Sequence, residues 1–529
     1  MALKHEAEFL EELLSDPVNH QDSKEQVKRL AQKYGLRPYE AENVWSFYRQ
    51  NQGSAKLCKG LPCTLKQNGS EKEVLRKLDG GSLEEISCLG HCDNGPVAWS
   101  NGKYYHIGDG SADELGPHLA RDGFREVHDL KDFLSMRGFE ALINVIKNDR
   151  KDESLQFVKD FNLRGFGGSG FPAYVKWNAV SNSREPEKYL LVNAHEGEPG
   201  TFKDRILIES NPYNLIEASL LAAAIVGASN VIIALKHEYL DAESILKSAF
   251  DSSMEYLIEV LGLLEIPKLR IQRVPGYYIT GEESALMEAI EGRRSEPRLR
   301  PPYPAEVGLY GKPTLIDNVE TLLYFLGRLR EFSETETKGP GEKVYCLSGD
   351  VEKPGAYSMP YGVSSGILIA QKGGSKVSDL KAIFPGGLSG GILPAGKGDL
   401  KLDFDSVKGE GAGMGTGALI AISKDRCMVN VMGTVESFFE TESCGKYLPC
   451  RYGTKELSKL FRDLSKGTAT IGAIESAKKT ANVMIKGSIC GLGQASAKMF
   501  LDSIKYFSWE LEKHVSGDCP SNVCFQDGR

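Results

Sequence analysis

Strand-like and helical segments alternate along residues 135–335, and this alternation constrains the fold more than any other feature of the sequence. KYLLVNA (188–194) and VIIAL (231–235) are short apolar runs of strand length. LIEASLLAAAIV (215–226) and AESILKSAF (242–250) are helical in pattern. Such alternation is typical of a sheet covered by helices. We therefore predict a layered α/β domain here, within a chain whose 529 residues exceed what one core supports.

The stretch from Leu215 to Leu235 is the most membrane-like part of the chain. Glu217 and the sequence GASN (227–230) interrupt it, so we predict a buried helix, a turn and a strand. The first residues, MALKHEAEFLEELL, lack the apolar core of a secretion signal. We therefore expect a cytoplasmic chain whose eleven cysteines stay reduced and ligate cofactors.

The remaining segments predict several smaller domains of different class. A net charge of −8 argues against general attraction to nucleic acid or anionic lipid, so the expected partners are proteins and small molecules. KVYCLSGDV (343–351) and SSGILIAQKGG (364–374) are strand-like runs in Gly-rich surroundings. The predicted units are a helical bundle (1–50), a compact α/β unit (51–125), the large α/β domain (135–335), a small β-rich domain (336–418) and a helical region (419–529).

Four cysteines in the first third have the spacing of a metal or cluster site. Cys58 and Cys63 form C-x4-C, and Cys88 and Cys92 form C-x3-C twenty-four residues later. Four thiolates are the ligands that a 2Fe–2S cluster needs, and the small residues around them allow backbone N–H groups to approach the sulfur atoms. Zinc and unliganded structural thiols are the alternatives. His91 is expected to tune the potential rather than to ligate.

A glycine-rich loop and an acidic strand end follow in the large domain. LRGFGGSGFP (163–172) contains G-x-G-x-x-G, but the preceding residues look helical, so the motif alone is weak evidence for a dinucleotide site. Lys176 is a plausible phosphate partner. NAHEGEPGTFKDR (193–205) resembles a ligand loop at the carboxyl end of a strand.

Two further polar segments lie in the same domain. GYYITGEESALMEAIEG (276–292) is followed by Arg298, Arg300 and Tyr303, and GKPTLIDNVETL (311–322) contains Asp317 and Asn318. Because all these segments belong to one α/β domain, we expect them to converge on one pocket.

The sequence ESCGKYLPCRYG (442–453) places Cys444 and Cys450 at the outer spacing of a C-x2-C-x2-C cluster loop. Tyr447 occupies the middle position. The loop is either a cluster loop that lost a ligand or a loop that never held a cluster.

These motifs together resemble the flavin-bearing NADH-oxidising subunit of respiratory complex I, and residues 1–120 resemble its thioredoxin-like 2Fe–2S partner subunit. A fusion of the two is similar to the diaphorase subunits of soluble NAD-linked formate dehydrogenases and hydrogenases. The resemblance implies an α/β multidomain fold: an N-terminal helical bundle, a thioredoxin-like 2Fe–2S domain, a Rossmann-like FMN domain, a β-grasp domain containing PGGLSGGILP (385–394), and a C-terminal helical bundle with a 4Fe–4S cluster.

The resemblance also implies a function, that of an NADH:acceptor oxidoreductase subunit of a larger redox complex. Hydride would move between NAD(H) and FMN, and single electrons would pass through iron–sulfur clusters to a partner catalytic subunit, either hydrogenase-like or formate dehydrogenase-like. The alternatives are a flavoprotein of the same fold with a different donor or acceptor, and a non-catalytic scaffold that bears a cluster.

Site residues follow from the resemblance, motif by motif. Glu198 and Glu283 would hydrogen-bond NADH and orient the nicotinamide rather than act as general bases. Phe171 and Tyr303 would stack on NADH, and Arg300 would lie near its phosphates. The implied FMN contacts are Gly165, Gly167, Gly168, Lys176, Asn193, Glu196, Tyr278, Gly281, Glu282 and Asn318.

Several positions depart from the pattern of this family. His195 stands where the family has Asp, Asp317 where it has Asn, Phe166 where it has Arg, Asn178 where it has an aromatic residue, and Thr280 where it has Cys. The glycines and both glutamate pairs are retained. The departures therefore bear on nucleotide affinity more than on the fold.

The C-terminal cysteines keep three positions of the family's cluster site. Cys490 follows Cys450 by forty residues, at the place of the fourth ligand, so Cys444, Cys450 and Cys490 are the expected ligands. Three thiolates allow a 3Fe–4S cluster, a 4Fe–4S cluster with an unusual fourth ligand such as Tyr447, or no cluster.

Four other cysteines lie outside both ligand sets. Cys427, Cys519 and Cys524 are candidates to replace the missing ligand. CPSNVC (519–524) is otherwise expected to be a mobile tail with free thiols or a metal site shared with another subunit. Cys346 and Cys427 are most simply core residues.

Overall fold

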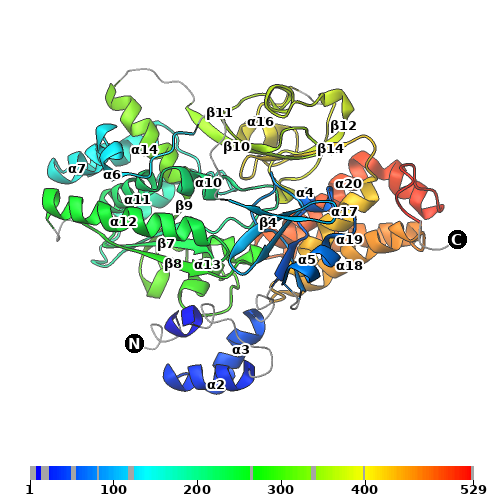
Figure 1. Cartoon of the computed structure of the whole chain (residues 1–529), viewed down its shortest axis with the longest axis horizontal. Coiled ribbons are helices and arrows are strands. Elements are labelled where there is room, and N and C mark those ends of the chain that lie inside the picture. Colours follow the sequence, from blue (N-terminus) through cyan, green and yellow to red (C-terminus); the bar gives the residue numbers. More distant parts are fainter. Residues whose placement is uncertain are drawn as a thin grey trace. The chain divides into compact units, whose positions relative to one another are not determined.

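The computed structural model describes residues 7–12, 23–48, 55–79, 83–116, 124–262, 266–334, 341–396 and 399–525 (Figure 1). The chain forms two compact units. Unit 1 comprises residues 1–53, 116–196 and 203–342, and unit 2 comprises residues 54–115, 197–202 and 343–529. The predicted domain boundaries near residues 50 and 336 lie outside the described residues, and the predicted bounds stay predictions.

Unit 1 is built on a parallel sheet of four strands in the order β8-β7-β6-β9. Its strands are β6 (Tyr189–Ala194), β7 (Asn230–Lys236), β8 (Lys268–Val274) and β9 (Thr314–Asn318). Its helices are α2 (Ser23–Lys33), α3 (Pro38–Tyr48), α6 (Leu130–Ser135), α7 (Glu140–Lys147), α8 (Lys151–Asp160), α9 (Ala173–Ser181), α10 (Lys203–Ser210), α11 (Pro212–Val226), α12 (Leu240–Leu261), α13 (Glu283–Ile290) and α14 (Val319–Glu334), with short 3-10 turns η3 (Tyr278–Gly281) and η4 (Leu309–Gly311).

Both faces of this sheet are buried, because successive side chains of a strand point to opposite faces. Leu190 and Val192 of β6 belong to the larger core cluster, which includes most of α11. Leu191 lies in a second cluster with Leu286 of α13 and Ile316 of β9. Burial on both faces explains why these strands read as continuous apolar runs.

The apolar stretch 215–235 forms a buried helix, a turn and a strand, which confirms the prediction. Asn211 caps α11 by accepting from the Asn214 amide over 3.0 Å, and Gly227 ends the helix at φ 70°. Strand β7 follows directly. Among the described residues, the helices are too short or too polar to cross a membrane.

Unit 2 begins with a five-stranded sheet in the order β2-β1-β3-β4-β5. Strand β1 pairs in parallel with β2 and antiparallel with β3, and α5 packs Val74 and Leu75 against Leu57 and Ala98. The elements are β1 (Ala55–Cys58), α4 (Leu61–Thr64), α5 (Glu71–Asp79), β2 (Leu83–Ile86), β3 (Val97–Ser100), β4 (Lys103–Ile107) and β5 (Ala112–Leu115).

A second sheet of unit 2 has the order β11-β10-β14-β12-β13, with β10 parallel and β12 antiparallel to β14. Its elements are β10 (Glu342–Gly349), β11 (Gly355–Pro360), α15 (Ser365–Ile367), the π-helical turn η5 (Leu368–Lys372), the 3-10 turns η6 (Val377–Asp379) and η7 (Leu388–Gly390), β12 (Leu380–Phe384), β13 (Leu393–Pro394), α16 (Phe404–Gly409) and β14 (Ala418–Ser423).

The strand predicted for SSGILIAQKGG is wrong, because residues 365–372 are helical. Two isoleucines in a short apolar run favour a strand by propensity. In the structure Ser364 caps the helix by accepting from the Gly366 amide, and Leu368 and Ile369 are buried. Capping and burial outweigh the weaker local preference.

The rest of unit 2 is a helical bundle, as predicted for this region (Figure 1). Its helices are α17 (Met428–Glu442), α18 (Leu448–Ser465), α19 (Ile471–Gly487) and α20 (Gly491–Val515). Their buried side chains include Phe439, Leu457, Phe461 and Phe500, and the ring centroids of Phe461 and Phe500 lie 6.2 Å apart. Thr470 caps α19 by accepting from the Ala473 amide.

Candidate functional site

Two asparagines stand at neighbouring carboxyl ends in the sheet of unit 1. Asn193, the penultimate residue of β6, lies opposite Asn318, the last residue of β9, and the Asn318 side-chain amide donates to the Asn193 carbonyl over 3.3 Å. Asn193 donates to the Gly281 carbonyl over 2.9 Å and accepts from the His195 amide over 3.1 Å. These contacts join three of the predicted site segments at the edge where parallel α/β sheets bind ligands.

Buried charges lie directly beside these asparagines. Asn318 donates to Asp204 over 2.6 Å, and the ammonium of Lys203 lies 2.6 Å from Asp204 and 3.2 Å from Glu320. Burial lowers the pKa of Lys203, but the two carboxylates outweigh it and raise that pKa well above its usual value. The sequence analysis predicted no role for Lys203 and Asp204, although both lie in the motif 193–205. Their partner Asn318 lies more than a hundred residues further along the chain, so no local pattern indicated the contact.

Glu196 belongs to the same network. Its carboxylate accepts from the backbone amide of Asp204 over 3.0 Å, at the start of α10, and from the Tyr239 hydroxyl over 3.2 Å. Burial, followed by the charge of Asp204, raises the pKa of Glu196 to about 7. In this structure Glu196 therefore anchors α10 to the end of β6.

The glycine loop folds back on itself next to Asn318. The Gly165 amide donates to the Phe171 carbonyl over 2.9 Å, and the Gly170 amide donates to the Gly165 carbonyl over 3.2 Å. A Cβ on Gly167 would lie 3.0 Å from Cβ of Asn318, so a larger residue needs a shift there. Gly168 has φ 129°, which L-residues rarely adopt.

Lys176 reaches the end of β9. Its ammonium lies 3.1 Å from Asp317 and donates to the Ile316 carbonyl, and Trp177 donates to Asp317 over 2.6 Å. Burial lowers the pKa of Lys176, but the charges of Asp317 and Glu283 raise it above its usual value. The Asp at 317 thus keeps Lys176 charged and holds it at this edge.

His195 presents an unsatisfied nitrogen toward the same place. Its Nε2–H donates to the Pro275 carbonyl over 2.9 Å, and burial together with the charge of Lys236 lowers its pKa to about 3. Its Nδ1 is buried and has no hydrogen-bond partner among the described residues. A Cβ on Gly281 would lie 3.1 Å from that Nδ1. We call the edge of the sheet formed by Gly165–Gly170, Asn193, Gly281 and Asn318 the cradle. A buried acceptor without a partner beside Gly281 fits a bound ligand with an N–H group, such as a flavin ring.

Arg300 is held by both predicted glutamates. It pairs with Glu282 and lies 2.7 Å from Glu283. Glu282 also caps α13 by accepting from the amides of Ser284 and Ala285, each over 2.9 Å.

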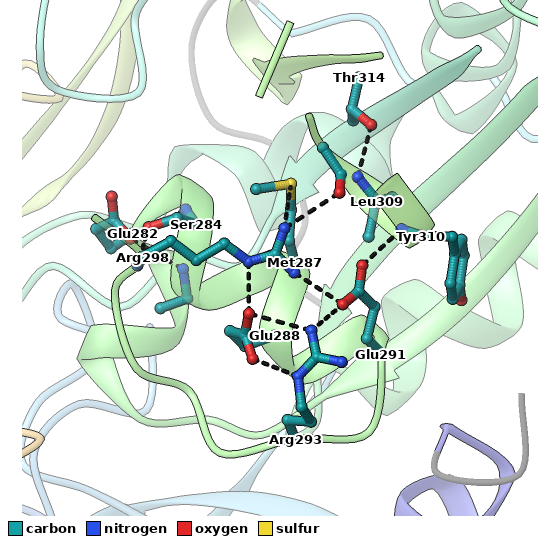
Figure 2. Close-up of polar contacts among 12 residues, drawn as sticks. Glu282, Ser284, Met287, Glu288, Glu291, Arg293, Arg298, Leu309, Tyr310 and Thr314 are labelled. Atoms are coloured by element: carbon teal, nitrogen blue, oxygen red, sulfur yellow. Dashed lines mark hydrogen bonds and ion pairs between the residues drawn. The ribbon is translucent and has the colours of Figure 1, made fainter. Parts of the chain in front are cut away.

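The segment that carries Arg300 is fixed by a network that sequence reasoning missed (Figure 2). Arg298 pairs with Glu288, lies 2.7 Å from Glu291 and donates to the Gly308 carbonyl over 3.1 Å. Arg293 pairs with the same two carboxylates. Because these carboxylates belong to α13 and its C-cap while the loop supplies both arginines, the network ties the loop to the helix.

The predicted stacking residues are exposed in unit 1. Phe171 is 45% exposed and Tyr303 is 55% exposed, so each ring has a face open to a planar ligand. Tyr278 is half-buried in η3. By contrast, Glu198 belongs to unit 2, where it accepts from the amide and hydroxyl of Ser389, each over 2.8 Å. Within unit 1 the structure joins Gly167, Asn193, Gly281 and Asn318 by direct contacts, and Arg300 pairs with Glu282 and Glu283.

The four N-terminal cysteines are all buried in unit 2. Cys58 contacts Cys63 and Cys88, and the Sγ atoms of Cys88 and Cys92 lie 3.8 Å apart, a distance that suits two thiolates on one iron. The Gly90 amide donates to Cys88 over 3.4 Å.

The surroundings of these thiols are equally specific. A Cβ on Gly95 would come within 2.9 Å of the Cys63 sulfur, so only glycine fits. The centroid of the His91 ring lies 4.0 Å from that of Tyr104, and its role beside the cluster stays a prediction. The donor set and its N–H groups fit a 2Fe–2S cluster.

Three C-terminal cysteines lie at helix ends in the bundle. Cys444 follows α17, Cys450 lies in the first turn of α18, and Cys490 is the residue at the N-cap position of α20. A Cβ on Gly493 would lie 3.0 Å from Cβ of Cys450, which shows that the start of α20 packs on Cys450. Tyr447 is the N-cap residue of α18 and is half-buried.

Comparisons with protein-family models agree with these three sites. Residues 158–325 match the Nuo51 FMN-binding domain, residues 10–111 match the thioredoxin-like 2Fe–2S ferredoxin, and residues 430–514 match the NADH-ubiquinone oxidoreductase-F iron–sulfur binding region. The cofactors expected from the sequence, FMN, a 2Fe–2S cluster and a 4Fe–4S cluster, are confirmed at the level of these domains.

Individual relatives give the same picture. The F 2 subunit of NADH-quinone oxidoreductase from Rhizobium meliloti (strain 1021) is 37% identical over 398 residues, which cover 73% of this chain and 94% of the relative. The HndC subunit of the NADP-reducing hydrogenase from Solidesulfovibrio fructosivorans is 32% identical over 413 residues, covering 76% and 84%.

A solved structure extends the similarity to nearly the whole chain. A chain of the NAD+-reducing NiFe hydrogenase in its H2-reduced state superposes with a TM-score of 0.82 at 28% identity, covering 96% of this chain and 92% of that one. The resemblance inferred from the motifs is therefore confirmed. This chain belongs to the family of NADH-quinone oxidoreductase F subunits, which are FMN- and iron–sulfur-binding oxidoreductase subunits.

Proposed function

We propose that this chain is the cytoplasmic subunit through which NAD(H) exchanges electrons with a partner catalytic subunit of a formate dehydrogenase-like or hydrogenase-like complex. The 84% coverage of a hydrogenase subunit and the superposition on a hydrogenase chain support a hydrogenase-like partner. When bound, FMN supplies the conversion between a two-electron hydride and single electrons.

The residues at the ends of β6 and β9 are proposed to hold FMN. The Gly165–Gly170 loop lets the backbone approach the ligand, and Lys176 supplies positive charge for its phosphate. Asn193 and Asn318 are already oriented by their bonds to Gly281 and Asp204. The Asn193 side chain keeps one N–H donor and one acceptor lone pair for a ligand, because its hydrogen bonds to Gly281 and His195 use only the others.

The NAD(H) contacts are proposed to lie on the open side of the cradle. Phe171 and Tyr303 offer exposed rings for stacking. Arg300 would exchange its pairs with Glu282 and Glu283 for a pyrophosphate, which frees Glu283 to hydrogen-bond the nicotinamide half. Glu198 stays a proposed NAD(H) contact, and its carboxylate accepts hydrogen bonds from the amide and hydroxyl of Ser389 within unit 2.

One observation carries this proposal. Four separate segments of the sequence meet at this edge of the sheet, where Asn193 contacts both Gly281 and Asn318, and Gly167 lies against Asn318. A polar, glycine-lined edge of this kind is costly for a protein that binds nothing there, because buried polar groups such as His195 Nδ1 stay unpaired.

The test is flavin occupancy of a variant that fills the cradle. Gly167→Val introduces a Cβ 3.0 Å from Asn318 and two methyl groups beyond it. We expect most FMN to be lost from protein purified without oxygen, together with NADH:ferricyanide activity. Gly327→Ala in α14 is the control, because its Cβ meets open space in the same unit. Full flavin occupancy in Gly167→Val would show that the site is misplaced.

The donor is a separate question with its own measurement. Anaerobic titration of the flavin absorbance with NADH, NADPH and reduced ferredoxin distinguishes the proposed donor from its rivals. Reduction by NADH at low concentration supports the proposal. Reduction by ferredoxin alone would favour the same fold with another donor, and a protein without flavin would favour a cluster-bearing scaffold.

A further inference from the structure

Four potential metal ligands converge in the bundle of unit 2, apart from both iron–sulfur ligand sets. They are Cys427, His514, Cys519 and Cys524, and one ligand atom from each lies within 4.8 Å of the others. The first three side chains are buried and Cys524 is half-buried. The sequence prediction of a tail with free thiols, or of ligands for the 4Fe–4S loop, does not describe this cluster. All four potential ligands of this cluster belong to this chain, so the site needs no ligand from another subunit.

The elements that deliver the ligands explain why they meet. Cys427 is the N-cap residue of α17, and His514 lies in the last turn of α20. The Met428 amide donates to Glu510 of α20 over 2.8 Å, which fixes the start of α17 beside the end of α20. The chain then turns after Val515 and brings Cys519 and Cys524 back over the same spot.

The distances match a tetrahedral metal site. The Sγ atoms of Cys427 and Cys524 lie 3.8 Å apart, and Sγ of Cys427 lies 3.3 Å from Nε2 of His514. Zinc–sulfur bonds of about 2.3 Å at tetrahedral angles place two sulfurs about 3.8 Å apart, and a sulfur and a nitrogen about 3.6 Å apart. The ligand atoms thus need little movement to surround an ion.

The histidine is already in the orientation that ligation requires. Its Nδ1–H donates to the Glu510 carbonyl over 2.7 Å, which leaves the Nε2 lone pair directed at Cys427. Metal-binding histidines commonly donate their second ring N–H to a carbonyl or carboxylate, which fixes the tautomer. The ring also packs 5.6 Å from Phe525, next to Cys524.

We propose that Cys427, His514, Cys519 and Cys524 bind one zinc ion that fastens the C-terminal residues 516–525 to the helical bundle. Three thiolates and one imidazole are a common ligand set of structural zinc, whose fourth position is closed by protein. Short segments of four residues separate His514, Cys519 and Cys524, as in zinc loops. The ion would offset two of the three negative charges of the thiolates and hold the segment after α20 against the start of α17.

Elemental analysis of the full chain tests the proposal directly. In protein purified without oxygen and passed over a weak chelating resin, we expect one zinc per chain in addition to iron. Cys524→Ser, which changes the least buried ligand, should lose the zinc and keep its iron and flavin. Cys346→Ser is the matched control, since Cys346 is a buried thiol outside all three sites and should retain zinc.

A rescue variant separates ligation from packing. His514→Cys completes a four-thiolate set and should keep zinc, whereas His514→Ala should lose it. Limited trypsin digestion gives an independent readout, because loss of the ion should expose the chain near Lys513 and speed cleavage there. Wild-type protein without zinc, iron instead of zinc at this site, or a Cys427–Cys524 disulfide found by mass spectrometry would each overturn the proposal.

Discussion

The backbone amide of Gly200 donates a hydrogen bond to the sulfur of Cys92 over 3.3 Å. Gly200 lies in the segment 197–202, which also contains Glu198, one of the residues proposed to contact NAD(H). This segment therefore contacts a predicted cluster ligand through Gly200 and Ser389 through Glu198. Hydrogen bonds to cluster sulfurs stabilise the reduced, more negative state, so we predict that this contact raises the 2Fe–2S reduction potential.

Gly200→Ala tests that contact. Gly200 has φ 95°, and a Cβ there would lie 2.8 Å from Ile420, so the substitution displaces the amide from Cys92. We expect a lower 2Fe–2S reduction potential in a redox titration followed by electron paramagnetic resonance, and a stability loss of about 1–3 kcal/mol from backbone strain. Gly411→Ala has similar strain at φ 83° but open space around its Cβ. It should lower stability alone, and an equal potential shift in both variants would refute the idea.

Cys58→Ser tests the N-terminal ligand set. Loss of one of four thiolates should abolish the 2Fe–2S paramagnetic signal. Reduction of the flavin by NADH should remain, because the proposed flavin residues belong to unit 1 and Cys58 to unit 2. Cys92→Ser should behave in the same way. A signal of full intensity in either variant would mean that these thiols are structural.

Tyr447→Cys tests whether only a ligand is missing from the C-terminal loop. A thiol at the start of α18 would again lie between Cys444 and Cys450, and we expect more iron per chain or conversion of a three-iron signal into a four-iron signal. Tyr447→Ser removes the phenol without supplying a thiolate and is the control. The side chain is half-buried, so packing loss should stay below the roughly 3–5 kcal/mol typical of a fully buried aromatic residue. Equal iron in the two variants would show that the loop does not recover a four-thiolate cluster.

Glu436→Gln should change the pH dependence of stability. Glu436 is fully buried in α17, accepts from the Ser496 hydroxyl over 2.7 Å, and its Oε1 has no hydrogen-bond partner among the described residues. Burial raises its pKa from 4.5 to about 8. The folded protein therefore keeps a proton that the unfolded chain releases above pH 4.5, so stability falls as pH rises from 4.5 to 8, by about 1.4 kcal/mol for each pH unit.

The glutamine variant lacks this titration. Its unfolding midpoint relative to wild type should rise steadily between pH 5 and pH 8, measured by thermal denaturation in matched buffers. Comparing the two proteins at each pH cancels the other titrating groups. A difference that is constant with pH would mean that Glu436 titrates near its usual value.

The sequence alone determined the parts of this protein that depend on short-range spacing. Alternating apolar segments predicted the buried helix α11 and strand β7, and the close pairs Cys58–Cys63 and Cys88–Cys92 predicted a cluster site. The family motifs also predicted the FMN-binding domain, which the match of residues 158–325 confirms. These features can be predicted from the sequence because each depends on residues within about ten positions of one another. This holds for the periodicity of helices and strands and for the spacing within each cysteine pair.

Tertiary structure decided the rest. Cys427 and His514 are 87 residues apart, and only the packing of α17 on α20 brings them together. The same holds for the bond between Glu198 and Ser389 and for the network of Arg298 with Glu291. Residues 365–372 became helical through a cap and burial that propensity does not include. Long-range contacts of this kind depend on how the elements pack in three dimensions, so no local pattern encodes them.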